Sequence, residues 1–222
     1  MRSLLIAAAL LCSLPAHAAQ IIIDTGHSPS SGGSTASDGT PEFKLNRAMA
    51  EQVISGLTAR GHQVVDVHAQ GLDRKLLDRT SPTRGADLFL SIHHDSVQQQ
   101  FLDEGRAGEF AGFAVFISGK ARKMEGTLKC AVHVGDAMVA AGEVPSRYHA
   151  APIPGENREL LDDRRGIHRF DGLAVLRSAQ SPALLLEVGV GVNPYEIGKL
   201  TNPEWIAGTA IHIVDGIERC LN

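Results

Sequence analysis

The sequence predicts one α/β domain, built on a single twisted, mostly parallel sheet of roughly six strands with helices on both faces. Near-continuous apolar runs at 21–23, 88–92 and 183–186 are typical of parallel strands that helices cover on both sides. Segments with helical periodicity alternate with these runs. A length of 222 residues suits one well-buried domain.

Residues 1–18 are typical of a cleaved export signal. Met1-Arg2 is positively charged, residues 4–14 are apolar, and Ala16-His17-Ala18 has the small-x-small form of a signal-peptidase site. We therefore expect a catalytic domain spanning 19–222, located in the periplasm or secreted.

The sequence argues against a membrane-spanning protein and against a general nucleic-acid binder. No later run approaches the roughly 20 apolar residues of a membrane span. The 21 Lys and Arg residues are outnumbered by 25 Asp and Glu residues, whereas a general nucleic-acid binder needs a basic surface. The sequence contains no internal repeat and defines no oligomeric state.

Two cysteines remain after the leader, Cys130 and Cys220. Neither lies in a CxxC motif, which argues against zinc ligation by cysteine. In an oxidising compartment they would form one disulfide between the last helix and a middle one; the alternative is two separate buried thiols.

The first half of the chain starts with a strand over the apolar run 21–23, which is followed by the Thr25-Gly26 turn presenting His27. A Ser-, Gly- and Pro-rich loop leads to Thr40 and Pro41, which suit the N-cap and first position of a helix from Glu42 to about residue 60. A strand at 64–67, a helix at 72–83 with Leu72, Leu76 and Leu77 on one face, and a strand ending at His93 follow.

The second half continues the alternation, with a strand at 112–118 and a helix at 124–141. The Pro-rich and acidic segment 145–165 interrupts this alternation. We interpret it as a long surface loop or excursion, and such loops are often lids in compact domains. Strands at 173–176 and 183–187 and a closing helix at 203–220 complete the prediction.

Four residues could form a hydrolytic metal site. His27, His93 and Glu187 each follow an apolar run, and the carboxyl ends of parallel strands meet at one edge of the sheet; Glu42 begins a helix facing that edge. Catalytic zinc takes three His, Glu or Cys ligands and leaves one position open. We hypothesise that His27, Glu42 and His93 bind Zn²⁺ and that Glu187 transfers protons.

Each residue taken alone has a simpler explanation. A histidine after a strand is often a hydrogen-bonded turn residue, and Glu42 suits a helix N-terminus in any case. Glu187 differs, because a carboxylate that ends a buried leucine run is unfavourable unless it is paired or functional.

Neighbouring polar residues leave further choices. His93 and His94 point to opposite faces of a strand, and we choose His93 because it is nearer the predicted strand end. Asp24 either orients a ligand histidine or bonds turn amides. Three other histidines have no comparable setting: His149, His168 and His212.

Four motifs in order resemble the zinc-dependent N-acetylmuramoyl-L-alanine amidases of the cell-separation type. Residues 21–33, IIIDTGHSPSSGG, resemble that family's opening Asp-x-Gly-His motif, and Glu42 with Leu45-Asn46 resembles its glutamate ligand. Residues 90–93 resemble its Ser-Ile-His motif, and 182–194, PALLLEVGVGVNP, resemble its closing strand with the catalytic glutamate. Arg79 also falls where the family commonly has an arginine.

The resemblance implies hydrolysis of the amide joining N-acetylmuramic acid to L-alanine in peptidoglycan. It implies His27, Glu42 and His93 as zinc ligands and Glu187 as general base. Some members carry an inhibitory helix that covers the zinc until a partner removes it, so an activator protein is an expected partner. Segment 145–165 would then either cover the zinc or shape a substrate groove.

Two other functions remain open at this stage. A zinc peptidase acting on the stem peptides would keep the metal and change the substrate. A non-catalytic cell-wall binding module would keep only the fold, although it would have little use for a carboxylate such as Glu187 beside the metal.

Overall fold

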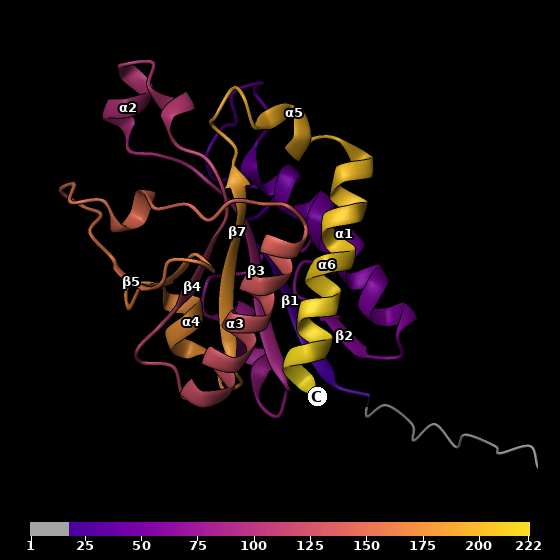
Figure 1. The fold of residues 1–222 in the computed structure, drawn as a ribbon. Helices are drawn as coiled ribbons and strands as arrows, with labels where there is room; N and C mark the ends of the chain where they lie inside the picture. The colour runs from indigo at the N-terminus through magenta and orange to yellow at the C-terminus, as the bar shows by residue number, and fades with distance from the viewer. Residues whose placement is uncertain (1–17) are drawn as a thin grey trace, which may run out of the picture.

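The computed structural model describes residues 18–222, so all but the last residue of the predicted leader lies outside the described residues. Figure 1 shows a sheet with helices packed against it. The sheet has seven strands in the order β2-β1-β3-β7-β4-β6-β5. The strands are β1 (Gln20–Thr25), β2 (Gln63–Asp66), β3 (Leu88–Asp95), β4 (Ala114–Ile117), β5 (Glu159–Asp162), β6 (Ile167–Arg169) and β7 (Ala183–Val190).

Most of the sheet is parallel, as predicted. Strands β2, β1, β3 and β7 run in parallel, β4 is antiparallel to β7, and β6 is parallel to β4. The chain forms two unpredicted strands, β5 and β6, within 159–169, a stretch whose charged residues hide the strand pattern, and it lacks the strand predicted at 173–176, so the total exceeds the predicted six by one. The α/β fold class is therefore confirmed with one more strand than expected.

The helices cover the two faces unequally. Helices α1, α3 and α6 pack together on one face, around a core that includes Ile23, Leu90 and Leu186. The other face carries a smaller core and is covered partly by α4. The helices are α1 (Glu42–Ala59), α2 (Gln99–Asp103), α3 (Met124–Ala140), α4 (Ala174–Ser178), α5 (Ile197–Leu200) and α6 (Pro203–Leu221).

The predicted helix at 72–83 is wrong. Only a 3-10 helix, η2 (Asp78–Thr83), forms there. The leucines expected on its buried face are solvent-exposed, with Leu77 65% exposed. Loop contacts replace the helical ones, since Arg74 Nε donates to the carbonyl of Val67 and Pro82 lies inside η2.

The predicted strand at 173–176 is also wrong, because that segment forms the short helix α4. Val175 and Leu176 are buried against the sheet from this helix. Four apolar residues are too few for periodicity to separate a strand from a buried helical turn.

Cys130 and Cys220 form a disulfide, which decides between the two alternatives that the sequence left open and joins α3 to α6 across 90 residues of sequence. Within residues 18–222 no helix combines the length and the apolar character that a membrane crossing requires.

Candidate metal and catalytic site

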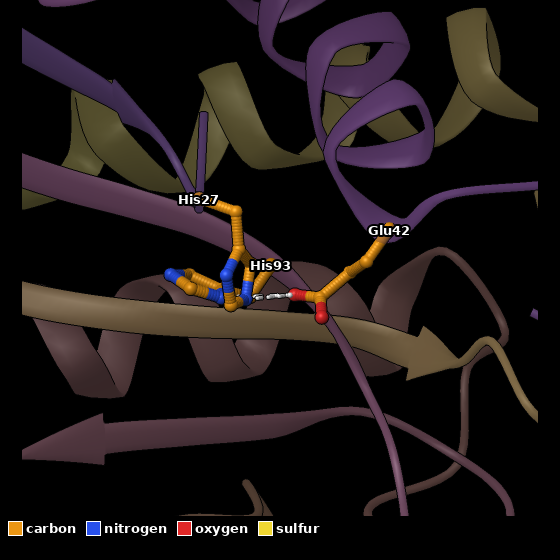
Figure 2. A group of neighbouring side chains, drawn as sticks. All are labelled: His27, Glu42 and His93. Carbon is orange, nitrogen blue, oxygen red and sulfur yellow. Dashed lines mark hydrogen bonds and ion pairs between the residues drawn. The ribbon is translucent and has the colours of Figure 1, made fainter. Parts of the chain in front are cut away.

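The structure brings His27, Glu42 and His93 together at the carboxyl edge of the sheet. One donor atom from each lies within 4.8 Å of the others. Glu42 Oε1 is 3.0 Å from His27 Nε2 and 3.1 Å from His93 Nδ1. Figure 2 shows the three side chains converging from the β1 turn, the start of α1 and strand β3.

Two glycines make this convergence sterically possible. A Cβ on Gly26 would lie 2.5 Å from the His93 ring, and a Cβ on Gly33 would lie 2.6 Å from both Glu42 and His27. His27 itself has a φ of 67°, a left-handed conformation uncommon outside glycine. The tight turn after β1 is therefore shaped around these imidazoles.

Glu42 is held ionised and in place by several donors. Ser34 donates to Oε2 from both its backbone N–H and its hydroxyl, at 3.1 and 3.0 Å. The Asn46 amide donates to Oε1 at 3.2 Å, and to the carbonyl of Gly26. Burial alone would raise the pKa of Glu42, but hydrogen bonds and charge from the two histidines outweigh it and hold the pKa well below its usual range.

Glu187 lies beside this cluster on the neighbouring strand. It pairs in register with His93 across β3 and β7, so both side chains project from the same face of the parallel sheet. Among the described residues Glu187 Oε2 is buried without a hydrogen-bond partner. Burial, and then the carboxylates of Asp95 and Glu42, raise the pKa of Glu187 well above its ordinary value.

The neighbouring polar residues take other roles. His94 projects from the opposite face and pairs through Nδ1 with Asn46 Oδ1 at 2.8 Å. Asp24 follows neither expected role: it accepts a hydrogen bond from Ser91 at 2.7 Å and lies 3.3 Å from His68 Nε2.

Sequence reasoning missed His149, which is buried between two carboxylates. Its Nε2 is 2.7 Å from Asp95 Oδ2 and its Nδ1 is 2.9 Å from Glu156 Oε2. Asp95 ends β3, so this histidine fixes the 145–165 excursion to the edge of the sheet near Glu187. No local pattern signals the contact, since 54 residues separate His149 from Asp95.

The donor set fits a catalytic zinc ion. Two imidazoles and one carboxylate are ligand types that Zn²⁺ takes in such sites. The glycine turn leaves room for them, and the His27 side chain is 33% exposed, so the cluster has an open side. Glu187 is free to act as a proton carrier because it is not among the three clustered donors.

Comparison with known proteins places this geometry in context. The family model described as N-acetylmuramoyl-L-alanine amidase matches residues 21–219. No curated protein matches the sequence.

Several solved structures share the fold. The N-acetylmuramyl-L-alanine amidase Ami1 from Mycobacterium smegmatis superposes with a TM-score of 0.77 at 22% identity, covering 94% of this chain and 99% of that chain. An amidase from Clostridium difficile 630 gives 0.73 at 24% identity, covering 91% and 96%. The CwlD amidase from Clostridioides difficile, solved in complex with the GerS lipoprotein, gives 0.62 at 19% identity, covering 91% and 98%.

Proposed function

Because this chain belongs to the N-acetylmuramoyl-L-alanine amidase family, we propose that it is a zinc-dependent enzyme cleaving the amide between N-acetylmuramic acid and L-alanine. Its family makes it a hydrolase of peptidoglycan. The observation that carries the catalytic assignment is the pairing of His93 with Glu187, which puts an unpartnered carboxylate beside a His, Glu and His cluster.

His27, Glu42 and His93 would hold the ion. A bound Zn²⁺ supplies Lewis acidity to the scissile carbonyl and to the attacking water. The protein contributes orientation: Ser34 and Asn46 fix Glu42 so that Oε1 faces both histidines.

Glu187 would transfer the proton of the attacking water. Its raised pKa suits a group that accepts a proton from the attacking water and then donates it to the departing amine of L-alanine. Water adds to the carbonyl carbon, the C–N bond breaks, and the water's proton leaves with the amine.

We propose that the 145–165 segment shapes a substrate groove and does not act as an inhibitory lid. Its Glu156 carboxylate, which could otherwise bind the metal, is paired with His149, and the metal cluster found among residues 18–222 includes no residue of the segment. We expect deletion of 150–159 to lower peptidoglycan release with metal retained. Higher release after deletion would identify an inhibitory lid instead, and an increase on adding cell extract to the intact protein would identify an activator.

We propose export to the periplasm or outside the cell. The leader pattern of residues 1–18 supports this, and so does the disulfide between Cys130 and Cys220, since such bonds persist in oxidising compartments.

Product analysis tests the reaction. Purified protein incubated with peptidoglycan should release intact stem peptides with a free L-alanine amino group and leave peptide-free glycan strands. Cleaved cross-links with intact lactyl-alanine bonds would identify a zinc peptidase. Binding to peptidoglycan without any new amino group would identify a binding module.

A further inference from the structure

A pocket of about 290 Å³ opens beside the metal cluster, and apart from His27 and His93 the mechanism above uses none of its lining residues. His27 and His93 form one of its walls. The other residues that matter here come from η2 and the segment just before it, and from around α4: Leu76, Arg79, Leu173 and Val175. A substrate whose scissile amide reaches the histidines would therefore extend one of its ends into this pocket.

Arg79 is a nearly buried cation in that pocket. Its side chain is 10% exposed, and a buried charge is unfavourable unless it is paired. Its Nε reaches the carbonyl of Arg74 only at 3.5 Å. Its Nη1 lies 3.8 Å from Asp24 Oδ1, an ion pair beyond hydrogen-bond distance.

Asp24 does not satisfy the guanidinium. Its Oδ2 accepts from Ser91 at 2.7 Å, and its Oδ1 makes no hydrogen bond to any described residue. Asp24 thus holds Arg79 in position by charge while the terminal nitrogens keep their hydrogen-bonding capacity. A planar guanidinium in this state is suited to bind a carboxylate through two parallel hydrogen bonds.

The chemistry of the substrate indicates which end enters the pocket. In a muramoyl-peptide the lactyl carboxyl group is consumed in the scissile amide, so free carboxylates lie only on the peptide side. We propose that Arg79 binds the free carboxylate of the second stem-peptide residue, the acidic residue that follows L-alanine. This inference rests on the proposed amidase function and adds a specificity residue to it.

The apolar wall is consistent with a peptide ligand. Leu76 is 49% exposed although it borders the site, and Leu173 and Val175 also line the pocket. A bound peptide would cover this surface with the alanine methyl group and the alkyl part of the acidic residue.

Two substrates that differ by one charge test the proposal. In muramoyl-L-alanyl-γ-D-glutamyl-L-lysine the α-carboxylate is the only free carboxylate of the second residue, because the γ-carboxyl is joined to lysine. Muramoyl-L-alanyl-D-isoglutaminyl-L-lysine carries an amide in place of that α-carboxylate. We expect the unmodified protein to show at least a tenfold lower KM for the carboxylate substrate, with similar kcat. Arg79→Gln should bring the two KM values together, Arg79→Lys should restore part of the difference, and Arg84→Gln, an exposed arginine five residues on, should leave it unchanged.

Equal KM values for the two substrates in the unmodified protein would overturn the proposal while leaving the amidase function intact. The proposal would also be overturned if Arg79→Gln and Arg79→Lys each lowered kcat/KM by the same factor for both substrates. Arg79 would then have a structural role only. Calorimetric titration with the product tripeptides L-alanyl-γ-D-glutamyl-L-lysine and L-alanyl-D-isoglutaminyl-L-lysine gives a readout independent of turnover. A protein that cleaves neither substrate fails as an amidase, and tighter binding of the glutamate tripeptide would still support the pocket assignment.

Discussion

Two glycines decide whether the three donor side chains can meet. Gly26 and Gly33 lie where any Cβ would enter the space of a donor side chain. Because the His93 ring packs directly against Gly26, the conformation of the turn after β1 and the position of the His93 side chain on β3 depend on each other. A sequence motif with glycine at this position is therefore a packing requirement of the site.

Gly26→Ala should displace the His93 ring and weaken metal binding at least tenfold, because the new Cβ would lie 2.5 Å from ring atoms. Calorimetric titration of the metal-free protein with Zn²⁺ measures this change in affinity. Gly198→Ala is the matched control, since nothing lies within 4 Å of a Cβ there. Unchanged affinity in Gly26→Ala would mean that His93 is not a ligand.

Asn46 supports Glu42 and the β1 turn at once, through donors to Glu42 Oε1 and to the carbonyl of Gly26. We expect Asn46→Ala to weaken zinc affinity roughly 10- to 100-fold, as is typical for a residue that orients a ligand. Competition with a chromophoric chelator measures the affinity. Wild-type affinity would show that Ser34 alone fixes the carboxylate.

At the scale of elements, the excursion at 145–165 depends on His149. Burial would lower its pKa, but the carboxylates of Asp95 and Glu156 outweigh burial and raise the pKa of His149 to about 9. The imidazolium therefore bridges β3 and the excursion at neutral pH.

Because of this pairing, we expect the stability of the fold to decrease at alkaline pH. A folded-state pKa raised above the ordinary 6.5 gives a contribution that is complete below pH 6.5 and is lost as pH rises through about 9. The contribution is roughly 3 kcal/mol, so Tm should fall by roughly 5–10 °C between pH 7 and pH 10. Thermal unfolding of His149→Gln should show a lower Tm at pH 7 and a smaller alkaline decrease; a parallel decrease in both proteins would contradict this role.

Elements with a long apolar pattern were predictable and short ones were not. The strands ending at His93 and Glu187 and helices α1, α3 and α6 follow from periodicity, although β3 and β7 run on to Asp95 and Val190. The helix predicted at 72–83 failed because its leucines, taken as one apolar face, are exposed to solvent. The strand predicted at 173–176 failed because four apolar residues do not distinguish a strand from a buried helical turn.

The predicted site residues converge, but the contacts around them could not be read from sequence. Glu42 lies 15 residues from His27 and 51 from His93, and only the fold joins them. The role of Asn46 depends in part on the backbone carbonyl of Gly26, 20 residues away, and that of His149 on the Asp95 carboxylate, 54 residues away. Tertiary contacts of this kind leave no local signal.

At the scale of the whole molecule, one disulfide ties the last helix to the middle of the chain. Closing a loop of 90 residues restricts the unfolded chain, which corresponds to roughly 4.6 kcal/mol in the loop-entropy model. Cys130→Ser should lower the free energy of unfolding by about 2–4 kcal/mol in urea titrations. Reduction of the unmodified protein should have a similar effect, and an unchanged midpoint in both would contradict it.

The most direct test of the central claim is to measure bound zinc and turnover together in Glu187→Gln. The account predicts one zinc per chain, as in the unmodified protein, with turnover on a muramoyl-peptide lowered by roughly 10² or more, because the metal ligands are intact and the proton carrier is lost. Full turnover with zinc bound would contradict the role of Glu187, and loss of zinc from this variant would contradict its position outside the ligand set.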